Sequence, residues 1–428
     1  MRPTMAIGTM HPSLTVLAAR PAACVNGCQL DVLVELNTPA PLASAQRQPV
    51  AIAIVIDRSG SMAGHKLQAA CAAAQQLLRQ LSARDRVAVI SFDNAVETVV
   101  PLGPPSEEAI ARIEALRPGG STALVDGWRA GLEALRDGQG LAQHHKRLLL
   151  LTDGQANVGP RRGSDVGPLV SAAWECGIST SCIGLGEDYD ERLLGTMAQE
   201  GQGNLVHITA PQQLEAVFTA ELEGLQLVIG RQLQLRLQPG PGVQLTQIHN
   251  PLDVNTEGWI DQGDLQAGSA PSLALGLQMA PRPWDGPAVV ELLKVQARWR
   301  DDDGQVAMVE ALLRLPVVEQ SAWDALPLEE AVVSAVLLQQ AARRRHEAMQ
   351  SMDCGDEHAS RSAVQRALDS LQAFKGNSAV QREEQLLGEL LDLLSTNKLS
   401  LARKVMGSQA YMRARGRKLR DQEGRDVL

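Results

Sequence analysis

The feature that most constrains the fold is an alternation of short apolar runs with amphipathic stretches between Gln48 and Leu225. The first run, VAIAIVI at residues 50–56, is apolar at every position. A strand covered by helices on both faces has this unbroken pattern, whereas a strand with one face in water alternates. Further apolar runs occur at 87–92, 147–152, 180–185 and 205–208. The alternation therefore predicts βαβ units and a doubly wound, mostly parallel sheet, which is an α/β fold.

The segments between these runs have helical periodicity. Leu67, Cys71, Ala74, Leu78 and Leu81 recur at steps of three and four, so one face of a helix over 64–82 should pack on the sheet. The same reasoning predicts helices at 106–116, 123–136, 164–176, 191–200 and 212–225. In such a sheet, ligands bind in the loops at the carboxyl ends of the strands.

The flanking segments have other patterns. Residues 226–320 alternate apolar and polar side chains, as in LQLRL at 233–237, and are predicted to form an antiparallel β module. The stretches 14–19 and 29–36, within residues 1–47, alternate in the same way and are expected to join that module. The α/β domain at 48–225 would then be inserted into an antiparallel β-sandwich. Residues 321–428 are predicted to be helical, with helices at 328–352, 359–374 and 380–395.

Length, charge and hydropathy exclude several classes of protein. The chain has 428 residues, enough for two or three domains at about 100–200 residues each. Its net charge of −9 argues against a general nucleic-acid binder, because such binding is mostly phosphate neutralisation by Lys and Arg. The N-terminus has no apolar stretch of signal-peptide length, and no run of about 18 apolar residues predicts a membrane span. We therefore expect a cytoplasmic location.

Two weaker features leave alternatives open. The spacing Cys24-x₃-Cys28 could supply half of a zinc site, but no second Cys/His pair lies nearby, so reduced structural thiols are favoured. Residues 398–428 contain nine Lys/Arg and three Asp/Glu. A solvated helix face followed by a basic tail is the favoured interpretation, and a contact with an acidic partner is the alternative.

The candidate chemistry begins directly after the first apolar run, with the sequence DRSGS at 57–61. Asp57 offers a charged oxygen, and Ser59 and Ser61 offer neutral hydroxyl oxygens at alternate positions. Gly60 is expected to permit the tight turn that directs them inward. The alternative is a purely structural role, in which these side chains only cap the following helix.

Two later loops belong at the same edge of the predicted sheet. Thr122 ends the GGST sequence before a helix, and Asp153 follows the apolar run LLLLT. With Asp57, Ser59 and Ser61 they provide two carboxylates and three hydroxyls, a set that suits Mg²⁺, with Mn²⁺ possible. Two carboxylates at most neutralise a divalent ion, so an open coordination position would favour the Asp or Glu of a protein partner.

These motifs resemble the von Willebrand factor A-type (integrin I-like) family over residues 48–225. The matching sequences are DRSGS at 57–61, GGST at 119–122 and LLLLTDGQANVG at 148–159. The resemblance implies that Asp57, Ser59, Ser61 and Thr122 coordinate a metal directly or nearly so, and that Asp153 acts through water. GLGEDYDERLL at 184–194 is similar to the bacterial calcium-activated chloride-channel-like or inter-alpha-trypsin-inhibitor heavy-chain-like branch.

Three neighbours of the motif are candidates for supporting or partner-facing roles. Asp93 and Asp126 could orient ligands or waters, with plain surface carboxylates as the alternative. Arg58, inside the metal loop, should be exposed and could help to select an acidic partner.

The function that these residues predict is Mg²⁺-dependent protein binding by a scaffold or accessory subunit rather than catalysis. A narrower version of this prediction is an accessory subunit of a AAA+ ATPase. The alternative is a hydrolase in which the same ion activates water. That role needs a general base, and both carboxylates of the candidate site are already assigned to the ion.

Overall fold

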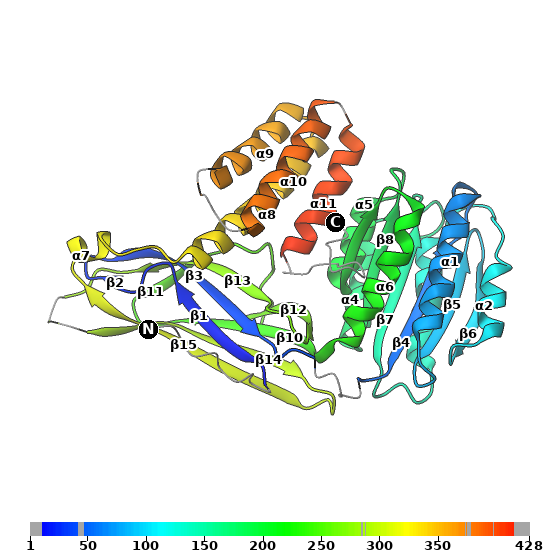
Figure 1. The fold of residues 1–428 in the computed structure, drawn as a ribbon, viewed down its shortest axis with the longest axis horizontal. Coiled ribbons are helices and arrows are strands. Elements are labelled where there is room, and N and C mark those ends of the chain that lie inside the picture. Colours follow the sequence, from blue (N-terminus) through cyan, green and yellow to red (C-terminus); the bar gives the residue numbers. More distant parts are fainter. Residues whose placement is uncertain are drawn as a thin grey trace. The chain divides into compact units, whose positions relative to one another are not determined.

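The computed structural model describes residues 11–41, 47–283, 286, 288–372, 374, 378–396 and 398–414, with side chains to residue 409 in the last segment (Figure 1). These residues form two compact units. One unit comprises the described residues from Arg47 to Ile229, and the other comprises those up to Pro41 and from Gly230 onward. The unit from Arg47 to Ile229 thus interrupts the other unit along the chain.

The unit from Arg47 to Ile229 is built on a six-stranded sheet with the order β6-β5-β4-β7-β8-β9. Its strands are β4 (Val50–Asp57), β5 (Arg86–Phe92), β6 (Val96–Gly103), β7 (His145–Thr152), β8 (Ile178–Leu185) and β9 (Gln202–Ile208). All neighbouring pairs are parallel except β5 and β6. Every residue of β4 is buried, which explains its unbroken apolar sequence.

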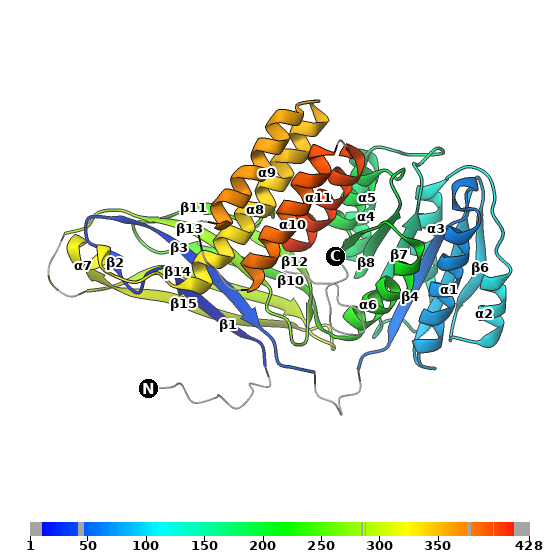
Figure 2. The ribbon, with the colours of Figure 1, turned by 45° about the horizontal axis from the view of Figure 1, so that its top comes forward.

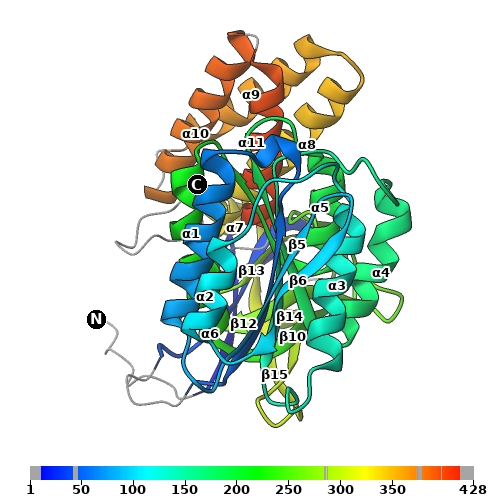
Figure 3. The same ribbon diagram turned by 90° about the vertical axis from the view of Figure 1, so that its right-hand side faces the viewer.

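Helices cover both faces of this sheet. They are α1 (His65–Gln80), α2 (Glu107–Glu114), α3 (Leu124–Asp137), α4 (Gly163–Glu175), α5 (Glu191–Glu200) and α6 (Leu214–Gln226), with short 3₁₀ turns η1 (Gly60–Met62) and η2 (Pro211–Gln213). Figure 3 shows α1 and α6 on one face and α3, α4 and α5 on the other. The predicted doubly wound α/β fold is confirmed, and β6 is an antiparallel edge strand that the periodicity did not predict.

The other unit contains two β-sheets. The first has the order β1-β3-β13-β11, from β1 (Ser13–Ala18), β3 (Cys28–Asn37), β13 (Ser272–Met279) and β11 (Val243–Ile248). The second has the order β12-β10-β14-β15-β2, from β12 (Trp259–Gln266), β10 (Val228–Pro239), β14 (Val289–Arg300), β15 (Val306–Val318) and β2 (Ala23–Cys24). Because β3 pairs with β13, with Leu33 opposite Ala274, strands from before and after the α/β segment share one sheet. The predicted insertion is therefore confirmed.

Helices complete this unit: α7 (Gln320–Asp324), α8 (Glu330–Asp353), α9 (Glu357–Gln372), α10 (Ser378–Ser395) and α11 (Leu399–Ala414). The four longer helices lie side by side (Figure 2) and share one apolar core. Near its start α8 packs on the first sheet, where Val332 contacts the buried Ala19 and Leu33. None of the helices described is both long and apolar enough to cross a membrane.

The start of the basic segment differs from the prediction. Residues 398–409 were expected to form a solvated face and the beginning of a tail, but α11 buries Ala402 and Met406 completely in the shared helical core. Residues 415–428, which carry most of the remaining basic side chains, lie outside the described residues.

Candidate metal centre

The five predicted ligands lie in three loops at the carboxyl edge of the parallel sheet. Asp57 ends β4, and Asp153 follows the last residue of β7. These strands are parallel neighbours, with Ile56 opposite Leu151, so the two carboxylates come together at the sheet edge. Thr122 precedes α3, whose first turn is tied to the end of β5 by a 2.7 Å hydrogen bond from the Ala123 amide to the Asp93 carbonyl.

Asp57 is fully buried and held by neutral donors. Its Oδ1 accepts a hydrogen bond of 2.8 Å from the Ser59 amide, and its Oδ2 accepts one of 2.5 Å from the Thr152 hydroxyl. Burial raises the pKa of this carboxyl; the hydrogen bonds counteract the rise and the negative charge of Asp153 adds to it. A cation beside Asp57 would therefore stabilise its ionised form.

The remaining candidate ligands form a connected set. The Ser59 and Ser61 hydroxyl oxygens are 3.2 Å apart, and the Ser61 hydroxyl donates to Asp153 Oδ1 at 2.6 Å. A Cβ atom built on Gly154 would lie 3.6 Å from Ser61 Oγ and 3.7 Å from Thr122 Oγ1, so both hydroxyls lie beside the same backbone position. The structure thus brings all five oxygen-bearing side chains to one place.

Lys66, in the first turn of α1, is a member of this site that the sequence reasoning missed. Its ammonium nitrogen lies 2.5 Å from Asp153 Oδ2, so both oxygens of that buried carboxylate have protein partners. A signal was present in the sequence: a basic residue five positions after the DRSGS loop stands in the first turn of α1, where the positive end of the helix dipole disfavours a cation. Its carboxylate partner comes from a loop 87 positions away, which the periodicity does not reveal.

Arg58 is not the exposed residue that was expected. Its side chain is 21% exposed, and it makes ion pairs with Asp93 at 3.5 Å and with Glu97 at 3.1 Å. The reason is that the Arg58 backbone is itself bound to a neighbouring loop, since its carbonyl accepts a 2.7 Å hydrogen bond from the Gly119 amide. The guanidinium thus contacts Asp93, which directly follows β5, and Glu97 of β6.

Asp93 supports the loop that carries Thr122. Its Oδ1 accepts from the Ala95 amide at 2.8 Å and its Oδ2 from the Gly120 amide at 3.3 Å. The Gly120 carbonyl in turn accepts from the Gly60 amide at 3.0 Å. Asp93 therefore links two of the three candidate ligand loops.

Gly60 does not have the role that was expected, and Asp126 matches the alternative of a plain surface carboxylate. Gly60 was expected to be needed for a tight turn, but its φ is not positive, and a Cβ there would meet only ordinary contacts with the carbonyls of Gly119 and Gly120. The turn itself is the 3₁₀ segment η1, which residues other than glycine can also form. Asp126 lies in the first turn of α3, 47% exposed, and pairs with Arg129 at 3.7 Å rather than with a candidate ligand.

The charge and the donor chemistry of the site fit a divalent cation. Asp57 and Asp153 are both fully buried, and Lys66 balances only one of the two negative charges. All five candidate ligands present oxygen, which suits a hard cation. The described part of the chain contains no group of three or more His, Cys, Asp and Glu that could hold a metal, so the candidate site depends on its three hydroxyls as well as on its two carboxylates.

Comparison with known proteins identifies the unit that carries this site. The family model for the von Willebrand factor type A domain matches residues 51–220. These residues form a von Willebrand factor type A (VWA) domain. The match covers the sheet, its helices and the three loops, and it confirms the predicted family.

Relatives are found among bacterial and animal proteins. The chain is 27% identical over 342 residues to an uncharacterised protein of Synechocystis sp., covering 75% of this chain and 78% of that protein. It is 32% identical over 164 residues to the inter-alpha-trypsin inhibitor heavy chain H3 of Mesocricetus auratus, covering 36% of this chain and 18% of the relative. The second likeness is thus confined to a small part of the longer protein.

The fold likeness extends beyond the VWA domain. A solved structure of a von Willebrand factor type A protein from Catenulispora acidiphila is similar with a TM-score of 0.68 at 18% identity. The similarity covers 88% of this chain and 89% of that one. The fold outside residues 51–220 therefore also occurs in another protein that has a VWA domain.

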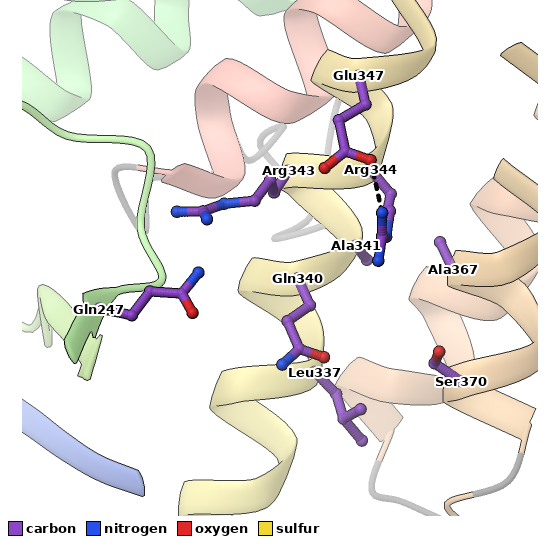
Figure 4. A pocket seen from close by; sticks show the side chains of 9 residues that line it. All are labelled: Gln247, Leu337, Gln340, Ala341, Arg343, Arg344, Glu347, Ala367 and Ser370. Atoms are coloured by element: carbon purple, nitrogen blue, oxygen red, sulfur yellow. Dashed lines mark hydrogen bonds and ion pairs between the residues drawn. The ribbon is translucent and has the colours of Figure 1, made fainter. Parts of the chain in front are cut away.

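A second polar site lies in the other unit, along α8 (Figure 4). Its basic side chains are Arg343 and Arg344, with Gln247 of β11 opposite. Arg343 donates to the Ile248 carbonyl at 3.1 Å, and Arg344 pairs with Glu347 at 2.7 Å. Both arginines therefore have partners within the protein: Glu347 balances the charge of Arg344, and a backbone carbonyl binds Arg343.

Proposed function

We propose that this protein binds a protein partner through a divalent cation held by its VWA domain. VWA domains commonly mediate metal-dependent protein–protein interaction, and the family model places this chain among them. Asp57, Ser59, Ser61 and Thr122 would hold the ion, with Asp153 supporting it through water. Mg²⁺ is the preferred ion because the ligands are hard oxygens and include only two carboxylates, and Mn²⁺ is the alternative.

The observation that carries the proposal is the convergence of five oxygen-bearing side chains, two of them buried carboxylates, with the ammonium group of Lys66 balancing one of the two negative charges. When bound, the ion supplies an electrophilic position for an Asp or Glu carboxylate of the partner. The protein's own side chains fix that position, because Asp57 and Asp153 are each held by two hydrogen bonds or ion pairs.

A binding role is favoured over hydrolysis by the same contacts. A hydrolase would need a carboxylate or imidazole free to take a proton from water. Asp57 would hold the ion and Asp153 would support it through water while also pairing with Lys66, so neither carboxylate of the site is left for that role. A role as an accessory subunit of a AAA+ ATPase rests on fold analogy alone and stays a prediction.

The test compares Asp57→Ala and Ser59→Ala with Asp137→Ala. Asp137 is an exposed residue at the far end of α3, about 20 Å along the helix from the Thr122 loop. We expect both site variants to bind Mn²⁺ more than about tenfold more weakly in calorimetric titration and to lose Mg²⁺-dependent partner recovery, while Asp137→Ala behaves like the parent. Partner recovery that is the same in Mg²⁺ and in EDTA would contradict the proposal. So would metal-dependent hydrolysis of phosphoester or peptide substrates that Asp57→Ala abolishes.

A further inference from the structure

Lys66 brings a third charge to a site whose candidate ligands carry two. Its ammonium nitrogen lies 2.5 Å from Asp153 Oδ2, and the Ser61 hydroxyl lies 2.6 Å from Asp153 Oδ1. Asp153 is fully buried, whereas the Lys66 side chain is 34% exposed and so reaches from the surface into the site. The carboxylate is thus fixed by one charged and one neutral donor.

The position of Lys66 in the helix argues for a role in the site rather than in the stability of α1. The first turn of α1 contains no acidic residue, so no side chain there offsets the unfavourable interaction of a cation with the helix dipole. The contact with Asp153 compensates for this placement. The nearest other basic side chain of the motif, Arg58, is already paired with Asp93 and Glu97.

The charge balance shows what Lys66 changes. Asp57 and Asp153 together contribute two negative charges, and Lys66 contributes one positive charge. With a divalent ion the site would carry a net charge of about +1, whereas without Lys66 it would be about neutral. A site with a net positive charge attracts an anion and binds its own metal less tightly, because the ammonium repels the ion and competes with it for Asp153.

We propose that Lys66 tunes two affinities of the metal centre. It lowers the affinity for the divalent ion and raises the affinity of the metal-loaded centre for a carboxylate ligand. This inference rests on the proposed function, because it assumes that the centre binds a divalent ion. Its ligand class is a carboxylate, such as the side chain of an acidic residue on a partner.

The test uses the full chain with Lys66→Gln and Lys66→Arg. The glutamine keeps a hydrogen-bond donor but removes the charge, and the arginine keeps the charge. Mn²⁺ affinity is measured by calorimetry, and acetate is then titrated into the Mn²⁺-loaded protein while water proton relaxation reports displacement of metal-bound water. We expect Lys66→Gln to bind Mn²⁺ about tenfold more tightly and acetate at least about threefold more weakly, while Lys66→Arg stays close to the parent.

The outcomes separate this inference from the proposed function. If the parent chain binds no Mn²⁺, the proposed function itself is wrong. If the parent binds Mn²⁺ but Lys66→Gln leaves both affinities unchanged or weakens Mn²⁺ binding, the role of Lys66 is wrong and the metal centre stands. Circular dichroism in EDTA checks that Lys66→Gln is folded. If it is unfolded, both variants are refolded with Mn²⁺ and their Mn²⁺ affinities are compared. Tighter binding by Lys66→Gln than by Lys66→Arg would support the inference, and the reverse order would overturn it.

Discussion

Gly119 and Asp93 show how residues that provide no metal ligand can decide where the ligands lie. A Cβ atom on Gly119 would stand 1.7 Å from Asp93 Oδ2, so only glycine leaves room for this carboxylate. Asp93 in turn accepts from the Gly120 amide and pairs with Arg58. Asp93 thus connects the loop that carries Thr122 to Arg58 of the DRSGS loop, beside the backbone hydrogen bonds that join the two loops.

We predict that Gly119→Ala lowers Mn²⁺ affinity by about tenfold, because Asp93 must move and the Thr122 loop moves with it. The overpacking should also destabilise the domain by about 1–3 kcal/mol. Gly195→Ala in α5 is the matched control, since a Cβ there would meet only Leu205 at 3.8 Å. Calorimetric titration with Mn²⁺ and chemical denaturation measure the two effects. Parent-like metal affinity in Gly119→Ala would show that the loop does not depend on Asp93.

At the residue scale, the sequence was sufficient to predict which five side chains come together and insufficient to predict their neighbours. Asp57, Ser59, Ser61, Thr122 and Asp153 were predictable because each stands at the end of a recognisable strand or the start of a helix. The contacts of Lys66 and Arg58 were not, because they depend on side-chain directions between loops far apart in the chain. The surrounding charges, and hence the electrostatics of the site, required the structure.

At the scale of elements, Asp85 ties the beginnings of two parallel strands together. Its carboxylate pairs with Arg47 at 2.5 Å and accepts from the Val50 amide at 3.0 Å and from the Ser82 amide at 2.7 Å. Burial raises the pKa of Asp85, but the hydrogen bonds from Arg47, Val50 and Ser82 outweigh it and hold the pKa well below the usual range. The ionised carboxylate therefore favours the folded state.

We predict that Asp85→Asn destabilises the VWA domain by about 2–4 kcal/mol at neutral pH, because it removes a buried charge from its donors. Since the folded pKa is below the unfolded one, the stabilisation by Asp85 is fully present above about pH 4–5 and is lost as the pH falls through the folded pKa. Urea denaturation of both proteins between pH 3 and 7 should show the difference narrowing below about pH 4. A difference that is constant across this range would contradict the assigned ion pair.

The elements that sequence patterns missed are those whose burial depends on distant partners. The first three residues of β6 are exposed, and the strand pairs only with β5, so it lacks the apolar run that revealed the central strands. In α11, basic residues stand among the apolar ones, and Lys404 itself is only 4% exposed. Its burial follows from packing against other helices of the bundle, which local periodicity does not encode.

At the scale of the whole molecule, the insertion separates two cores that share one chain. The strands β1 and β3 precede the VWA domain in the chain, and their sheet partners β13 and β11 follow it. All six strands of the VWA sheet belong to its own unit. The alternation of patterns along the sequence was enough to predict this arrangement, because a change of period marks a change of architecture.

We predict that thermal unfolding of the full chain occurs in two transitions and that Mg²⁺ raises only one of them. A ligand stabilises the unit that binds it, by about 2.7 kcal/mol at a hundredfold excess over its Kd. For a domain of about 180 residues this corresponds to a rise in Tm of about 5–10 °C. Differential scanning calorimetry in EDTA and in Mg²⁺ measures both transitions, and in Asp57→Ala the rise should be no more than about half that of the parent, because a tenfold weaker affinity leaves about 1.4 kcal/mol of stabilisation at the same Mg²⁺ concentration. A single transition would mean that the two units unfold as one, and an equal rise of both transitions with Mg²⁺ would mean that stabilisation of the VWA domain is transmitted to the other unit; either result would contradict the prediction.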